Sequence, residues 1–240
     1  RNPTSINYYR RMGYLPEALV NFLGLMGHSM PDGREQFSLD EFVEAFSLER
    51  ITLGAPVFDQ EKLAWLNGTW LRGLDDAEFA DRVQHWALNR EHLLPIVPLV
   101  KARTERLADL VDLAGYLVGE TRRLTPEAFA ELPLEEETVL EVLQYTLWRL
   151  EALEDWTREA LVEAVEALAG AMELKIRAFL GPLFLALAGR AVALPLYDSM
   201  VILGPDLTRV RIREAIEVLG GVSKKQAKRF EKRYRELVAD

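Results

Sequence analysis

The chain has 240 residues, a formal net charge of −9 at pH 7 and no cysteine. Its 49% hydrophobic and 28% charged residues are typical of a soluble globular protein and exclude a disordered one, and its length allows one large core or two to three small domains. The lack of cysteine excludes disulfide frameworks, thiolate catalysis and cysteine-ligated zinc, and with the absence of an apolar N-terminal stretch it agrees with a cytoplasmic protein without a signal peptide.

The first third of the chain predicts short helices separated by turns. Ser38 and Glu41 have the spacing of a capping box, and Asp59 can cap the helix that follows. The pair Asn67-Gly68 predicts the end of that second helix. Strand signals are few, and residues 50–53 (Arg-Ile-Thr-Leu) are the best candidate.

The middle of the chain predicts longer helices. Apolar residues from about 90 to 119 are spaced for one helix face, which indicates one long amphipathic helix. Thr125 is placed to cap a further helix, with Pro126 at its first position. Two more helices are expected at about 135–151 and 157–179.

Prolines and glycines divide the last third. The most apolar stretch, residues 178–189, spans 12 residues, which is too short to cross a bilayer, and Gly181-Pro182 interrupts it, so we expect a buried helix pair. Pro195 and Pro205 predict short helices after it. The glycines at 220 and 221 end one helix, and Ser223 caps the last. The predicted fold is predominantly all-α.

Positive charge is concentrated at the C-terminal end. Residues 209–240 contain ten Lys/Arg and five Asp/Glu, a local net charge of +5. The preceding 208 residues contain 19 Lys/Arg and 33 Asp/Glu, a net charge of −14. Charge alone therefore predicts only local contact with a nucleic-acid backbone.

The sequence lacks the patterns of a self-contained active site. No glycine-rich phosphate loop follows a strand, and no Ser/His/Asp order stands out. The histidines at 28, 85 and 92 are not spaced as metal ligands, so no metal site and no catalytic residue is predicted. Runs of acidic residues on helices are usually solvated faces.

Six blocks in the first 75 residues resemble bacterial glutamyl-tRNA synthetase just after its KLSKR-type signature loop. They are residues 2–5 (NPTS), 13–19 (GYLPEAL), 25–31 (LMGHSMP), 37–42 (FSLDEF), 54–59 (GAPVFD) and 62–68 (KLAWLNG). Residues 100–107 (VKARTERL) resemble the arginine motif of that family's first anticodon-binding domain. Segments 182–190 and 196–204 resemble its last helical domain.

The resemblance implies the C-terminal, tRNA-binding portion of a class I aminoacyl-tRNA synthetase without its catalytic Rossmann domain. Residues 1–75 would be a stem-contact domain, mostly helical with at most a few short strands. Residues 76–130 and 131–240 would form an α-helical anticodon-binding cage, which is the bacterial arrangement. The whole protein would be a glutamate–tRNA ligase using ATP and Mg²⁺, whereas this part would hold no cofactor and be inactive alone. Its expected partner is tRNA(Glu), with tRNA(Gln) left open, and neither DNA nor a membrane; we expect a monomer.

The resemblance also implies specific tRNA contacts. Arg103 would read the third anticodon base, which suits a guanidinium because it donates to base edges and stacks on bases. The alternative is a surface arginine in a helical i,i+4 network, and Arg106 competes for the same role. Leu196 matches a position next to the anticodon, although a leucine at helical spacing suits a core equally well.

A second set of contacts is implied for the inner side of the tRNA near the D-stem. Lys62 and Trp65 share a helix face at i,i+3 and would meet phosphate and a sugar or base. The alternative for Trp65 is a place in the core. Ser29 and Pro31 match the family's stem-contact turn.

The last domain departs from the family pattern. Phe184 stands where some members have an arginine, so that anticodon contact is not carried over. Residues 224–235 have no counterpart and predict an amphipathic basic helix, whose phosphate contacts would be Lys224, Lys225, Lys228 and Arg229. A solvated lysine-rich helix is the alternative. The net charge of −14 over residues 1–208 leaves one alternative open for the whole chain. The chain would then be a helical protein-interaction module that derives from the synthetase and no longer binds RNA.

Overall fold

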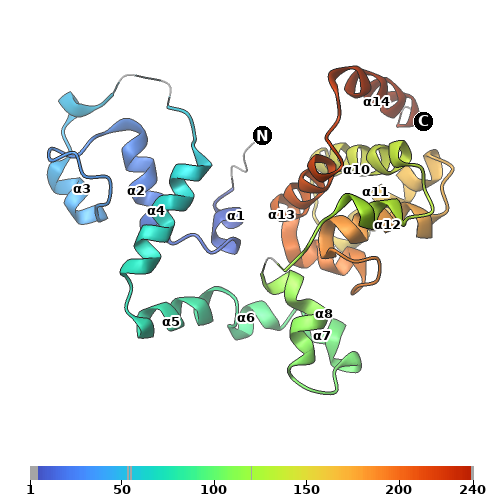
Figure 1. The fold of residues 1–240 in the computed structure, drawn as a ribbon, viewed down its shortest axis with the longest axis horizontal. Coiled ribbons are helices and arrows are strands. Elements are labelled where there is room, and N and C mark those ends of the chain that lie inside the picture. The colour runs from blue at the N-terminus through green and yellow to red at the C-terminus, as the bar shows by residue number, and fades with distance from the viewer. Residues whose placement is uncertain (1–4, 53, 55, 120, 239–240) are drawn as a thin grey trace. The chain divides into compact units, whose positions relative to one another are not determined.

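The computed structural model describes residues 5–52, 54, 56–119 and 121–238, and these residues are almost entirely helical (Figure 1). The all-α prediction is confirmed. Within this part of the chain, no helix combines the length and the apolar character that crossing a bilayer requires. The described residues form two compact units, 5–89 and 90–238. The division at 75 and 130 stays a prediction.

The unit of residues 5–89 is built on the packing of α2 against α4. Its core is an aromatic and leucine cluster of Tyr9, Phe22, Leu63 and Leu66, with Phe58 against it. The helices are α1 (Ile6–Arg11), α2 (Pro16–Gly27), α3 (Leu39–Ala45), the 3₁₀ turn η1 (Leu48–Arg50), α4 (Gln60–Gly73) and α5 (Asp76–Trp86).

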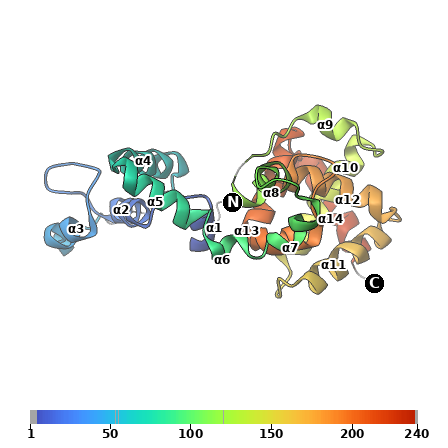
Figure 2. The same cartoon turned by 90° about the horizontal axis from the view of Figure 1, so that it is seen from below.

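The unit of residues 90–238 is a helical bundle (Figure 2), and α10 is the helix on which most of the others pack. This helix packs on α11, α12, α13 and α14 and is buried along most of its length. The elements are α6 (Arg90–Leu93), α7 (Val97–Val100), η2 (Lys101–Arg103), α8 (Asp109–Val118), α9 (Pro126–Ala130), α10 (Glu136–Glu151), α11 (Arg158–Ala171), α12 (Ile176–Ala188), α13 (Leu196–Val218) and α14 (Lys224–Leu237).

The predicted helix starts are confirmed. Ser38 forms a capping box with Glu41, and Asp59 accepts from the backbone N–H of Glu61 and Lys62. Thr125 caps α9, with Pro126 at its first turn. Ser223 forms a second capping box at α14, with Gln226. Each cap needs only residues within three positions, so the sequence contains the whole signal.

The predicted strand at 50–53 is wrong for the residues that can be described; Leu53 lies outside them. Arg50 belongs to η1, and Ile51 makes an isolated antiparallel bridge with His28. Thr52 donates its N–H to the carbonyl of Gly27 at 2.9 Å. Because the 3₁₀ turn runs up to Arg50, Ile51 and Thr52 are the described residues of this segment left for pairing, too few for a strand.

The predicted end of α4 at Asn67-Gly68 is also wrong, because the helix continues to Gly73. The side chain of Asn67 is buried and accepts from the N–H of Leu15 at 2.8 Å. The asparagine therefore fixes the start of α2 against α4. A tertiary hydrogen bond has overridden a local stop signal.

Residues 90–119 do not form one helix. The segment breaks into α6, α7, η2 and α8, and Pro98 lies in the first turn of α7. Before α8, the Asp109 carboxylate accepts from the N–H groups of Glu105 and Arg106 at 3.0 and 2.8 Å, which stabilises a turn. Leu107 is 93% exposed, so the apolar positions do not share one buried face.

The boundaries predicted after residue 157 are wrong in two places. The helix expected at 157–179 ends at Ala171, because Glu173 adopts a left-handed conformation with φ of 55°. The expected helix pair at 178–189 is one helix, α12, with Pro182 inside it. Gly181 lets Leu132 approach so closely that an added Cβ would lie 3.0 Å from it. Tertiary packing thus offsets the hydrogen bond that Pro182 cannot donate.

The other breaks in the last third are confirmed. Pro195 precedes α13, and Gly204, with φ of 74° and ψ of 171°, kinks that helix just before Pro205. Gly220 and Gly221 have φ of 88° and 75° and end it. Left-handed φ values are accessible to glycine without steric cost, which explains these residues at the helix end.

Candidate nucleic-acid interface

The outer face of α4 presents a lysine and a tryptophan together. The opposite face of the helix buries Leu63 and Leu66. Trp65 is 51% exposed, which excludes the alternative that it belongs to the core. Lys62, one turn before it, is partly exposed, and its Nζ lies 2.6 Å from a carboxylate oxygen of Glu35. The structure therefore places Lys62 and Trp65 as an exposed cation and an exposed indole on one helix face.

Ser29 and Pro31 are both exposed and lie at a turn after α2. Gly33 closes this turn by donating its N–H to the carbonyl of Met30 at 3.0 Å, and its φ of 76° requires glycine-like freedom. Met30 is buried and anchors the turn. The two predicted residues are thus presented on a fixed loop, and Glu35 of the same loop meets Lys62.

Asn21 holds this loop in place, although no motif in the sequence marks it. Its buried side chain donates from Nδ2 to the carbonyl of Glu35 at 2.9 Å. Its Oδ1 accepts from the N–H of Phe37 at 3.3 Å and from Nε1 of Trp70 at 3.1 Å. Asn21 therefore joins the loop to α2 and α4. The only signal in the sequence is an asparagine within an apolar helical run.

In the unit of residues 90–238, Arg103 ends η2 and is exposed. Among the described residues it has no hydrogen-bond or ion-pair partner. Arg106 differs, because its Nη2 and Nε lie 3.0 and 3.2 Å from Oδ1 of Asp109. The backbone N–H of Arg106 also donates to this carboxylate and is the main reason that the pKa of Asp109 lies below its usual value. Arg103 is free to contact a ligand, and Arg106 is engaged.

Leu196 lies at the start of α13 and is only 4% exposed. Its side chain belongs to the core of the bundle. In this conformation it offers almost no surface to a base, so its predicted place next to the anticodon finds no support in its exposure.

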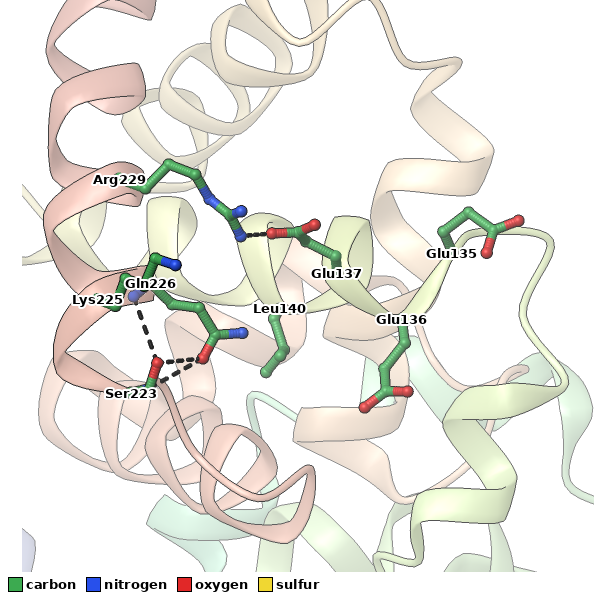
Figure 3. A pocket seen from close by; sticks show the side chains of 8 residues that line it. All are labelled: Glu135, Glu136, Glu137, Leu140, Ser223, Lys225, Gln226 and Arg229. Atoms are coloured by element: carbon green, nitrogen blue, oxygen red, sulfur yellow. Dashed lines mark hydrogen bonds and ion pairs between the residues drawn. The ribbon is translucent and has the colours of Figure 1, made fainter.

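The four basic residues predicted on the C-terminal helix fall into two groups. Lys224, Lys225 and Lys228 are exposed and have no ion-pair partner within the described chain. Arg229 is paired with Glu137 of α10 (Figure 3). A cavity of about 750 Å³ lies beside this pair, lined by Glu135, Glu136, Glu137, Leu140, Ser223, Lys225, Gln226 and Arg229.

Metal-binding chemistry does not fit the residues described. They contain no group of three or more histidine or acidic side chains that could hold a metal ion.

Family models match both parts of the chain. Residues 78–216 match the anticodon binding domain, and residues 1–65 match the catalytic domain of class I tRNA synthetases (E and Q). The second match covers most of the segment expected to contact the tRNA stem.

Curated relatives match along nearly the full chain. A glutamate–tRNA ligase of Marinomonas sp. is 50% identical over 99% of this chain and 48% of its own length. That of Alcanivorax borkumensis is 49% identical over the same shares. A solved glutamate tRNA ligase from Elizabethkingia meningosepticum is 27% identical with a TM-score of 0.49, and the match covers 88% of this chain and 43% of that one.

This chain spans about half the length of the curated relatives it matches. An anticodon-binding model follows a class I synthetase model along it, and the relatives are glutamate–tRNA ligases. These matches confirm the resemblance to a C-terminal portion of bacterial glutamyl-tRNA synthetase. Because the anticodon-binding model covers more than half of its residues, the chain belongs to the anticodon-binding domain family.

Proposed function

We propose that this chain binds tRNA(Glu) and recognises its anticodon as part of a glutamate–tRNA ligase. The observation that carries the proposal is Arg103, which is exposed, has no side-chain partner in the described part of the chain, and lies inside the region that matches the anticodon-binding family. A guanidinium presents a planar set of donors that matches base edges and can stack on an unpaired base. The unpaired bases of an anticodon loop are the kind of RNA target that such a group reads.

The residues on and near α4 supply the second contact in this proposal. Trp65 exposes an indole that can stack on a base or sugar, and Lys62 exposes a cation suited to phosphate. Ser29 and Pro31, on the loop that Asn21 holds, would lie against the same side of the tRNA. These contacts would position the tRNA stem while Arg103 reads sequence.

In the whole protein, these contacts would place the acceptor end of the tRNA for the attachment of glutamate. ATP and Mg²⁺ are the cofactors that we expect this reaction to use. We propose a cytoplasmic monomer with tRNA(Glu) as the main partner; tRNA(Gln) is the second substrate to test. The comparisons give no support to a protein-interaction module that has lost RNA binding.

Replacing Arg103 tests the proposal. Arg103→Ala removes one base contact, which is worth about 1–3 kcal/mol, so tRNA(Glu) affinity should fall about 5- to 150-fold. A tRNA(Glu) changed at the third anticodon base should already bind the wild type weakly. Its affinity should therefore decrease little further when Arg103 is replaced by alanine. Filter binding of both tRNAs at one fixed salt concentration measures the difference.

Arg106→Ala is the matched control, because it removes the same charge three residues away from a side chain held by Asp109. It should keep the preference for the native anticodon. If Arg103→Ala keeps that preference as well, Arg103 does not read the anticodon. If the wild type does not bind tRNA(Glu), the proposed function itself is wrong.

A further inference from the structure

The cations of α14 are divided between two sides of the helix. Arg229 and Arg233 face α10, where Arg229 pairs with Glu137 and Arg233 lies 2.7 and 2.8 Å from the two carboxylate oxygens of Glu141. Glu141 is buried, so this pair is partly removed from water. Arg229 and Arg233 thus dock the helix, whereas the third arginine of α14, Arg235, is exposed and pairs with Glu231 of the same helix.

Aromatic packing attaches α14 to α10 as well. Phe230 is fully buried, and its ring centroid lies 5.7 Å from that of Tyr145. Tyr234 lies 5.6 Å from Tyr145 and 5.3 Å from Trp148, again between ring centroids. Since the apolar side of α14 is covered by these contacts, the opposite side of the helix is a fixed, exposed surface.

That opposite side is formed by lysines, here called the lysine face: Lys224, Lys225, Lys228 and Lys232. They are four of the seven lysines of the chain. Lys232 lies 3.8 Å from Glu236, and the other three have no ion-pair partner within the described residues. At 3.6 residues per turn, positions 225, 228 and 232 follow one stripe along the helix.

The neighbouring cavity cannot account for these charges. Three consecutive glutamates, at 135, 136 and 137, line it, and one of them already neutralises Arg229 (Figure 3). An anion entering there would meet like charge. Lys225 also lines this cavity, but among the described residues the lysine face makes one ion pair, that of Lys232 with Glu236. The lysine face is therefore the surface of α14 that suits an extended anion.

We propose that the lysine face of α14 binds the phosphate backbone of the tRNA, as a contact additional to Arg103. This inference rests on the proposed function, because it assigns a second surface for the same RNA. Lysine ammonium groups act as point charges that neutralise phosphates and release counterions without reading sequence. The face therefore adds affinity and salt dependence but leaves anticodon preference to Arg103.

Two other kinds of partner fit the surface less well. Binding flat on a lipid membrane requires an apolar face next to the basic one, and the apolar face of α14 is covered by α10. A protein interface is usually centred on aromatic or arginine anchors, whereas both aromatic residues of α14 pack on α10 and its exposed Arg235 is paired with Glu231. Binding to the phosphates along an RNA strand requires neither an uncovered apolar face nor such anchors.

The experiment compares two double variants that remove the same charge. Lys225→Ala with Lys228→Ala changes the lysine face, and Lys175→Ala with Arg177→Ala removes two exposed cations of the same unit beside the start of α12. Affinity for tRNA(Glu) is measured from low to moderate salt. The first pair should flatten the slope of log affinity against log salt by roughly 1.5 and lower the affinity at low salt about 10-fold or more.

A variant with all four lysines changed to alanine should extend the loss and still unfold at the wild-type temperature, because no docking contact is removed. Its preference for the native anticodon should stay intact, which separates this result from a failure at Arg103. Equal losses in the two double variants would overturn the inference, since net charge would explain them. The inference would also be wrong if the slope of log affinity against log salt were the same in the lysine variants and the wild type. Binding of anionic vesicles through the lysines, with tRNA binding unchanged, would contradict it as well. If the wild type bound no tRNA, both the inference and the proposed function would be wrong.

Discussion

Arg103 and Arg106 lie three residues apart and have different surroundings because of Asp109. That carboxylate holds the side chain of Arg106 and accepts two backbone N–H groups at the turn before α8. The sequence identified both arginines as competitors. It could not separate them, because the distinction depends on a turn inside a segment that looked like one continuous helix.

Asn21 allows a stability prediction at the residue scale. Asn21→Ala would leave the buried N–H of Phe37 and Nε1–H of Trp70 without their acceptor and would release the carbonyl of Glu35. Unmade buried hydrogen bonds cost about 1–3 kcal/mol each, so the free energy of unfolding should fall by about 2–4 kcal/mol. Urea unfolding of the purified chain checks this value.

A matched control for Asn21 is Gln36→Ala, in the same loop but exposed. It should change the free energy of unfolding by less than about 0.5 kcal/mol, as surface substitutions usually do. A comparable loss in both variants would mean that Asn21 is not the residue that holds the loop.

The docking of α14 is the feature to test at the scale of elements. Phe230→Ala removes a fully buried ring between Tyr145 and the helix, a change that usually costs about 3–5 kcal/mol. The loss should fall mainly on α14, because this helix packs mainly on α10 and can open locally. Hydrogen exchange of the α14 amides should therefore accelerate strongly while that of α10 stays slow.

Lys228→Ala serves as the control for this experiment, because it changes an exposed residue on the same helix. Its α14 amides should exchange at nearly the wild-type rate. If the α14 amides of Phe230→Ala also remain protected, the aromatic contacts are not what attaches the helix.

Helix starts were predictable and helix ends often were not. Ser38, Asp59, Thr125 and Ser223 act within a few residues of the chain, so their patterns were sufficient. The stop expected at Asn67, by contrast, was overridden by a hydrogen bond to Leu15, 52 positions away. The candidate site shows the same limit: its exposed residues could be named, but the loop anchor Asn21 depends on partners that only folding brings together.

Buried tyrosines give a prediction for the whole unit of residues 90–238. Burial is the main cause that raises the pKa of Tyr197 to about 12, and it also raises the pKa values of Tyr116 and Tyr145 above 10. A raised folded-state pKa contributes stability that is fully present below pH 10 and is lost as the pH rises through the folded-state pKa. The unfolding temperature should therefore fall between about pH 10 and 12.

Tyr197→Phe tests the origin of this loss. The hydroxyl of Tyr197 is buried without a hydrogen-bond partner among the described residues, so its removal should not weaken the fold at pH 7. Between pH 10 and 12, the unfolding temperature of the variant should decrease by less than that of the wild type. An identical alkaline profile in both proteins would show that Tyr197 contributes nothing to it.

The separation of the docking residues from the lysine face on α14 has a consequence for how such a protein changes over generations. The residues that hold the helix, Arg229, Arg233 and Phe230, are different from those that make up the lysine face. Mutations can therefore add or remove surface charge one residue at a time without unfolding the helix. The affinity for RNA can therefore change by mutation and selection, while the residues that dock α14 stay the same.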